Sequence, residues 1–243
     1  MITVRRAQDR QHERRGKREV WHTFPPNDPA LEFSEGFGIL ALLDEHLLPP
    51  GATVLRQPAS DAELLTYVHE GALACEDSTG RSGVIQAGEF QRMNLSRGFR
   101  HTKANPSRAA WAHVFQLRLT RAEASSEERY EQKRFSAAER RGAFRPVATP
   151  DARKGSLQSA QALLYSVLLT PGKHLLHELS SGQHAWIHVV LGDVTMGDLI
   201  LTAGDGAGLE HERSVSLTAR EAAEVLLCDL GEGPRAGTPV SVR

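Results

Sequence analysis

Three ionisable residues in the first half of the chain, Glu63, His101 and Lys103, supply a carboxylate, an imidazole and an amine. If the fold places them in one pocket, they could donate and accept protons without a metal, and burial would tune their pKa values. The chain contains no Gly-x-Ser-x-Gly sequence, so its serine, histidine and aspartate residues indicate no hydrolase nucleophile. These residue types therefore permit acid–base chemistry, but they name no substrate and leave the catalytic residues unknown.

The second half of the chain is rich in histidine, which raises the question of a metal site there. The histidines are His174, His177, His184, His188 and His211. On a strand, residues 184 and 188 would share a face but lie about 13 Å apart, and residues 174 and 177 would point to opposite faces. The spacing therefore favours histidines that face solvent or line the fold, although strands that converge in space could still gather them around a metal.

Short apolar stretches of strand length, separated by turns, run through the chain. Examples are FGILALL, LLTYV, EGALA and VIQAGEF, which alternate with the turn sequences PPG, DSTGRSG and SRG. This alternation predicts an all-β protein. The chain has 243 residues, of which 40% are hydrophobic and 24% are charged, so it is long enough for one large domain or two smaller domains with a buried core.

The turns of the first half return in the second half, which indicates an internal duplication. Two landmarks recur after 121 residues and a third recurs after 116 residues. The recurring pairs are Pro50–Gly51 with Pro171–Gly172, Gly71 with Gly192, and Gly88 with Gly204. Because a meander of strands must close or stack to hide its edges, each copy predicts a small barrel or jelly roll.

The duplication sets the expected domains at residues 1–120 and 155–243. The segment 121–154 between them is charged and poor in large apolar residues, which is typical of a linker. Within this segment, the sequence SAAERRG predicts one or two helical turns. The two cysteines, Cys75 and Cys228, have no CxxC or metal-ligand spacing, so we expect reduced core cysteines that form no disulfide with each other.

The first repeat resembles a cupin motif that has lost its histidines. Gly51 is followed by Gln57, Ala59 and Glu63 at the spacing of the motif's glycine, His-x-His and glutamate. Longer segments, among them GFGILALLDEHLLPPG, RYEQKRF and GQHAWIHVVLGDVT, resemble the pirin family of bicupins in the family's order, and closely its bacterial quercetinase-like branch. The resemblance covers most of the chain and implies an all-β bicupin, with two cupin barrels of the jelly-roll type packed together.

In metal-bearing relatives, the resemblance implies four iron ligands in the first barrel. Carried over residue by residue, their places fall on Gln57, Ala59, His101 and Lys103, of which only His101 is retained. One imidazole cannot supply the converging ligands that a divalent ion needs, so we expect no metal and no cofactor. We expect a ligand pocket at these four residues and Glu63, in which Lys103 either replaces the metal as the counter-ion of Glu63 or reaches solvent.

The resemblance and the broken ligand set together imply a pirin-like protein that has lost the family's metal-dependent activity and acts as a small-ligand-binding or regulatory protein. The alternatives are an oxygenase of the quercetin 2,3-dioxygenase type, with iron or another divalent metal, and the metal-free acid–base enzyme. A formal net charge of -1 and scattered aromatic residues argue against direct nucleic-acid binding, and no apolar run has the length of a membrane span. We expect a cytoplasmic protein whose partner is a small molecule or another protein, in an oligomeric state that the sequence leaves open.

Overall fold

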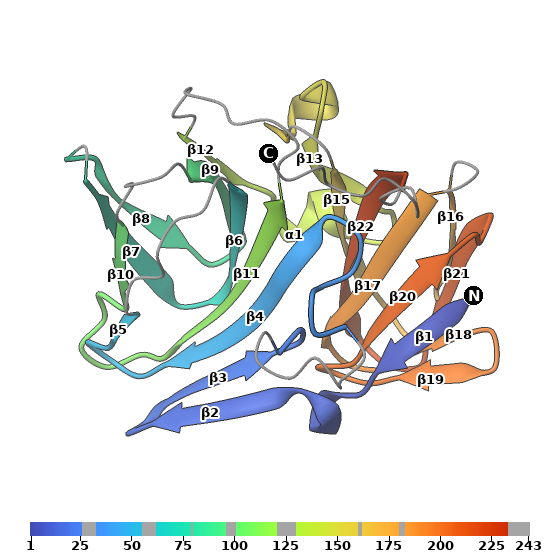
Figure 1. Cartoon of the computed structure of the whole chain (residues 1–243), viewed down its shortest axis with the longest axis horizontal. Coiled ribbons are helices and arrows are strands. Elements are labelled where there is room, and N and C mark those ends of the chain that lie inside the picture. Colours follow the sequence, from blue (N-terminus) through green and yellow to red (C-terminus); the bar gives the residue numbers. More distant parts are fainter. Residues whose placement is uncertain are drawn as a thin grey trace, which may run out of the picture.

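The computed structural model describes residues 1–25, 33–54, 62–78, 80–95, 101–120, 130–159, 162–179 and 183–232. Its elements are almost all β-strands, arranged as two barrels side by side (Figure 1). This arrangement confirms the predicted all-β class and its two barrels. Within the described residues, no helix has the length and hydrophobicity needed to cross a membrane.

The first barrel pairs a seven-stranded sheet, in the order β12-β9-β6-β11-β4-β3-β2, with a four-stranded sheet, in the order β5-β10-β7-β8. All strand contacts within these two sheets are antiparallel. The strands are β2 (Gln11–Arg15), β3 (Arg18–His22), β4 (Leu40–Leu48), β5 (Thr53–Val54), β6 (Ala62–Glu70), β7 (Ala72–Asp77), β8 (Ser82–Gln86), β9 (Glu89–Leu95), β10 (His101–Ala104), β11 (Ala112–Thr120) and β12 (Tyr130–Arg134).

The second barrel repeats this plan, with a seven-stranded sheet in the order β1-β20-β17-β22-β15-β13-β14 and a four-stranded sheet in the order β16-β21-β18-β19. Its central strands β20-β17-β22-β15 correspond to β9-β6-β11-β4 of the first barrel, as the duplication requires. The strands are β1 (Ile2–Arg5), β13 (Arg145–Thr149), β14 (Leu157–Gln158), β15 (Leu163–Leu169), β16 (His174–Glu178), β17 (Gln183–Leu191), β18 (Val194–Met196), β19 (Leu199–Leu201), β20 (Gly206–Glu210), β21 (Ser214–Ala219) and β22 (Ala223–Glu232).

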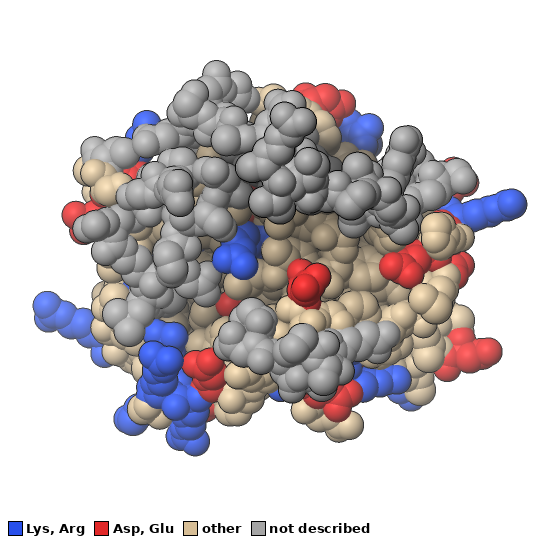
Figure 2. Space-filling view, viewed as in Figure 1, with Lys and Arg blue, Asp and Glu red and all other residues tan. Residues whose placement is uncertain are grey.

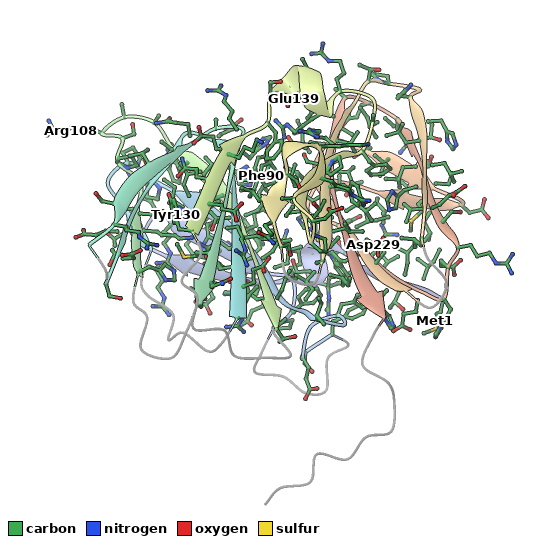
Figure 3. All side chains as sticks on the ribbon, turned by 90° about the horizontal axis from the view of Figure 1, so that it is seen from above. Met1, Phe90, Arg108, Tyr130, Glu139 and Asp229 are labelled. Atoms are coloured by element: carbon green, nitrogen blue, oxygen red, sulfur yellow. The ribbon has the colours of Figure 1, made fainter. Side chains whose placement is uncertain are left out.

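A large core lies between the two seven-stranded sheets, in addition to the core inside each barrel. Side chains of both halves of the chain meet in it, including Leu65, Phe90 and Phe115 from the first half and Trp186 and Leu226 from the second. Phe90 lies between the two barrels in the view from above (Figure 3). Burial of these apolar side chains against one another holds the barrels together as one body.

The backbone at the repeated glycines confirms that the two halves are duplicates. Gly71 and Gly192 have φ angles of 74° and 73°, and Gly51 and Gly172 have φ angles of 72° and 76°. These positive angles lie in the left-handed region, which residues other than glycine adopt only at a cost in conformational free energy. The same turn conformation is therefore built at equivalent places in both barrels.

Gly192→Ala should destabilise the protein more than Gly172→Ala, although both glycines have nearly the same φ. A Cβ at position 192 would lie 2.1 Å from the carbonyl oxygen of Ala222, whereas a Cβ at position 172 meets nothing within 4 Å. We expect about 1–2 kcal/mol for the backbone strain in either variant and about 1–3 kcal/mol more at position 192 for the clash. Urea unfolding of the two variants measures the difference, and equal losses would contradict the close approach at Gly192.

The segment expected as a linker, residues 121–154, takes part in both barrels. Within it, β12 pairs with β9 of the first barrel and β13 pairs with β15 of the second. Between them lies the predicted short helix, α1 (Ala137–Arg140), whose capping box joins Ser136 and Glu139. The structure also differs from the expected boundaries at the other end of the chain, because β1 pairs with β20 of the second barrel although it lies within residues 1–120. The strand β1 therefore completes a sheet of the second barrel, and the segment 121–154 adds a strand to each barrel. Local sequence patterns do not indicate these long-range pairings.

Candidate functional site

Lys103 crosses the interior of the first barrel. It lies on β10 of the four-stranded sheet, opposite Cys75 on β7, and its Nζ donates a hydrogen bond of 2.6 Å to Oγ1 of Thr66 on β6 of the other sheet. The residue is only 1% exposed, and burial lowers the pKa of its amine. Lys103 is therefore a buried amine and not the solvent-facing lysine that the sequence allowed.

Glu63 is not placed as the counter-ion of Lys103. Glu63 and Thr66 are three residues apart on β6, so their side chains leave opposite faces of the strand. The buried Glu63 carboxylate accepts a hydrogen bond of 3.1 Å from Arg92 on β9. The structure therefore separates Glu63 from the interior amine, and the expected acid–base trio does not form around Lys103.

The same barrel interior contains a histidine that the sequence reasoning missed. His46 on β4 lies opposite Val114, which belongs to the apolar core inside the barrel. It is 3% exposed, and neither of its ring nitrogens has a hydrogen-bond partner. Burial lowers its pKa to about 4, so the imidazole is neutral near pH 7. The sequence could have indicated this position, because Asp44 and His46 are two residues apart in the apolar run LALLDEHLL. Residues at this spacing share one face of a strand.

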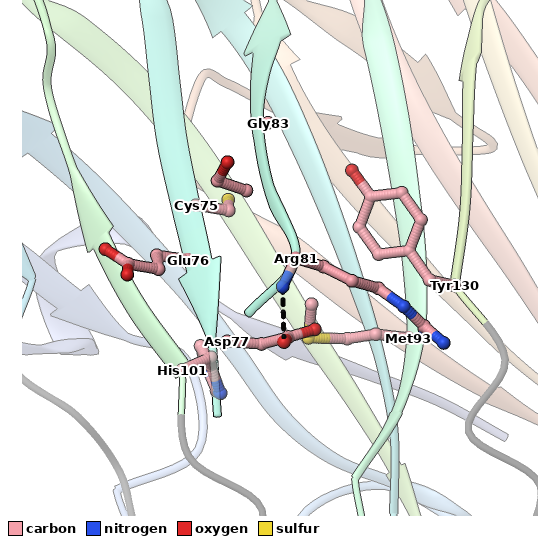
Figure 4. Close-up of a pocket in the computed structure, with 9 residues that line it drawn as sticks. Cys75, Glu76, Asp77, Arg81, Gly83, Met93, His101 and Tyr130 are labelled. Atoms are coloured by element: carbon pink, nitrogen blue, oxygen red, sulfur yellow. Dashed lines mark hydrogen bonds between the residues drawn. The ribbon is translucent and has the colours of Figure 1, made fainter. Parts of the chain in front are cut away.

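A cavity of about 270 Å³ opens in the first barrel, next to the start of β10 at His101. It is lined by Cys75, Asp77, Met93, His101 and Tyr130, together with Glu76, Arg81, Ser82 and Gly83. In Figure 4 the thiol, thioether and phenol of this set surround the space, and the Asp77 carboxylate accepts a hydrogen bond of 3.1 Å from the backbone N–H of Arg81. The cavity is therefore lined by apolar and sulfur-containing groups together with charged side chains, a combination that small-molecule sites commonly have.

Both cysteines are free and buried, as predicted, and only Cys75 belongs to this cavity. Cys228 lies on β22, and burial raises the pKa of its thiol to about 12. A thiol with so high a pKa is almost entirely protonated near pH 7 and is a poor nucleophile. Cys228 is therefore a core residue without a role at the site.

The described residues do not fit the metal site that the resemblance implied. His101 lines the cavity, but the place of the carboxylate ligand holds the amine of Lys103, which is bound to Thr66. Gln57 and Ala59, the other two ligand places, lie outside the described residues. In the parts of the chain that are described, no group of three or more histidine, cysteine, aspartate or glutamate side chains is arranged to hold a metal ion.

Three histidines of the second half make contacts with different partners. His177 lies 3.6 Å from Asp229, His184 lies 3.5 Å from Glu210, and both pairs belong to the second barrel. His188 is fully buried on β17, where its ring lies 5.6 Å from that of Phe115 in the first barrel. These histidines therefore serve separate local contacts.

Charges on the surface are mixed in sign. In the face shown in Figure 2, lysine and arginine side chains gather at the lower left, and aspartate and glutamate side chains lie at several places across the face. This distribution agrees with the formal net charge of -1.

The fold and the motifs define this chain as a bicupin, and comparisons with known proteins place it in a family. A model of the pirin family matches residues 5–119, and a model of the quercetinase C-terminal cupin domain matches residues 146–230. A quercetin 2,3-dioxygenase of Escherichia coli K12 is 35% identical over 231 residues, which cover 95% of this chain and 99% of that protein. The chain belongs to the bacterial pirin family.

Solved structures agree with this assignment. YhhW from Escherichia coli superposes with a TM-score of 0.88 at 35% sequence identity, covering 96% of this chain and 98% of that chain. A second structure, bacterial pirin YhhW in complex with nickel(II), has a TM-score of 0.86 at 34% identity and covers 96% and 100% of the two chains. A pirin-like protein of Caulobacter vibrioides is 27% identical over 200 residues, which cover 79% of this chain and 84% of that protein.

Proposed function

We propose that the first barrel of this pirin binds a small molecule without the family's metal, so that the protein acts as a small-ligand-binding or regulatory protein. The observation that carries the proposal is Lys103, whose buried amine lies at a ligand place of the resemblance and is bound to Thr66. A primary amine in this position supplies neither the charge nor the geometry of the carboxylate that it replaces. The neighbouring cavity of about 270 Å³ gives a small molecule room inside the same barrel.

A second candidate is a metal-dependent oxygenase of the quercetin 2,3-dioxygenase type. It is favoured by the 35% identity to the Escherichia coli protein of that name and by the similarity to a pirin solved in complex with nickel(II). In this reading, His101 and residues outside the described segments would have to provide the ligands.

Flavonol turnover in the presence of added iron(II) or nickel(II) separates the two candidates. We expect no turnover by the wild type, and metal uptake by the triple variant Gln57→His, Ala59→His and Lys103→Glu, because it rebuilds the implied ligand set around His101. Lys173→Glu is a matched control, since it makes the same charge change at an exposed lysine of the second barrel. Metal-dependent turnover by the wild type would overturn the proposal and establish the oxygenase.

A further inference from the structure

We propose that Lys133 and Arg145 form an anion site where the outer strands of the two barrels meet, and that this site binds a phosphate group. The site lies on the strands β12 and β13 and on the short turn η2 (Arg153–Gly155). It shares no residue with the cavity of the first barrel, so the inference goes beyond the proposed function and does not depend on it.

The two cations come from different barrels. Lys133 lies on β12, the outer strand of the first seven-stranded sheet, and Arg145 lies on β13 of the second seven-stranded sheet. Both strands lie on the upper side of the molecule in Figure 1. The ring of the fully buried Phe135 lies 5.9 Å from Nζ of Lys133 and 5.3 Å from Cζ of Arg145. Both cations are therefore close enough to be attracted to one aromatic ring, which holds them at one place.

The turn η2 brings two adjacent residues against the same pair of cations. The carbonyl oxygen of Lys154 accepts a hydrogen bond of 2.6 Å from Nη2 of Arg145. A Cβ at Gly155 would lie 2.8 Å from Nζ of Lys133, so this glycine leaves the room that the amine occupies. Lys133 and Arg145 therefore meet at two neighbouring residues of one turn.

The positive charge at this place is only partly neutralised. Among the described residues, Lys133 forms no ion pair. Arg145 is paired with Glu139 at 3.6 Å, but the Glu139 side chain is 45% exposed and also accepts a hydrogen bond from the backbone N–H of Ser136. The exposed Lys154 adds a third cation. Like charges in close approach repel each other, and a bound anion would remove this repulsion.

The other acidic residues of these segments have cations of their own. Glu131 on β12 lies 3.9 Å from Arg92, and Asp151 before the turn lies 3.8 Å from Arg153. They are therefore engaged away from the anion site. The three cations of the site, with one carboxylate against them, leave two positive charges without compensation.

A phosphate group matches both this charge and these donors. It carries about two negative charges near neutral pH. A guanidinium group binds phosphate through its forked N–H donors, and a lysine amine binds it as a point charge. Nε of Arg145 has no hydrogen-bond partner, so this guanidinium has donor capacity that the protein itself does not use. The geometry therefore favours a phosphate over a singly charged anion.

Isothermal titration calorimetry with phenyl phosphate and with inorganic phosphate, at pH 7.5 and fixed ionic strength, tests the proposal. We expect one phosphate site per wild-type chain and an affinity at least about tenfold lower in Lys133→Gln, because a charge-assisted hydrogen bond is lost. Lys133→Arg keeps the charge and should retain most of the affinity. Lys17→Gln, in the basic turn between β2 and β3, is the matched control and should bind as the wild type does.

The two probes separate the sources of the phosphate group. Binding of both assigns the site to free phosphate and to phosphate esters, and binding of one assigns it to that source. No saturable binding by the wild type, or an equal loss in Lys133→Gln and Lys17→Gln, would overturn the proposal. Phenyl phosphate that binds Lys133→Gln as tightly as the wild type occupies another place, such as the cavity of the first barrel. That result would overturn the anion site and leave the proposed function standing.

Discussion

Glu224→Gln is expected to destabilise the protein by about 3–5 kcal/mol, because it removes the carboxylate from a buried ion pair and leaves an arginine unpaired. Glu224 on β22 accepts hydrogen bonds from Arg140 at 2.8 Å and from Tyr67 at 2.5 Å, and its other oxygen lies 3.1 Å from Nδ1 of His69. Tyr67 and His69 belong to the first barrel, and Arg140 ends the helix between the barrels. The carboxylate therefore joins both barrels and the connecting segment.

Glu221→Gln is the matched control for this variant. Glu221 lies three residues earlier in the chain and is exposed, so the same change should alter the free energy of unfolding by less than about 0.5 kcal/mol. Urea unfolding monitored by tryptophan fluorescence measures both variants. A loss below about 1 kcal/mol for Glu224→Gln would contradict the assignment of this cluster as the link between the barrels.

A second carboxylate, that of Glu45, lies at the same interface, but on a strand that is not the counterpart of β22. Glu45 on β4 accepts a hydrogen bond of 2.6 Å from Arg10 and lies 2.7 Å from Nε2 of His113. The strand register makes Glu45 and His113 the counterparts of Ser166 and Glu224 in the second barrel. Each half therefore retains one carboxylate bound by an arginine, but on a different strand.

Acidification should destabilise the protein strongly between pH 6.5 and pH 4, because two histidines are buried in the neutral form. Burial lowers the pKa of His188 to about 3 and that of His46 to about 4. In the unfolded chain both take up a proton near pH 6.5, so the stability present above that pH is lost as the pH falls through this window. Each histidine contributes a slope of about 1.4 kcal/mol per pH unit.

The variant His188→Phe should remove one of these two slopes. His69 does not obscure the effect: although burial opposes its protonation, Glu224 raises its pKa, so its contribution is lost only as the pH rises above 6.5. His174→Gln changes an exposed histidine and is the control. Free energies of unfolding measured at half-unit steps of pH test the prediction, and an unchanged slope in His188→Phe would contradict a neutral His188.

Much of the fold was predictable because its turns depend on glycine. Gly71 and Gly192 mark the same left-handed turn in each repeat, so the duplication could be seen without knowledge of strand pairing. The pairing of β1 with β20 was not predictable, because its partners lie about two hundred residues apart and the pattern within β1 names no partner. For the same reason, the sequence did not predict that β12 and β13 of the expected linker pair with strands of the two barrels.

The candidate site was predictable in part. The resemblance led to His101 and Lys103, which the register places on one face of β10. It did not indicate that Glu63 faces Arg92, because this pair joins strands whose register only the folded sheet defines. The place of His46 was not predicted, because the alternation along an apolar strand does not show which face lines the barrel interior and which packs against the other barrel.

The metal content of the wild-type protein shows whether the first barrel has lost its metal site. The protein would be produced in cells supplied with iron and nickel, purified without chelators, and analysed by inductively coupled plasma mass spectrometry. We expect well below one iron, nickel, copper or zinc ion per chain, and no rise in Tm on addition of nickel(II), because a ligand stabilises a fold only by binding it. One tightly held ion per chain, with a rise in Tm that is lost on chelation, would contradict this expectation and favour the metal-dependent oxygenase.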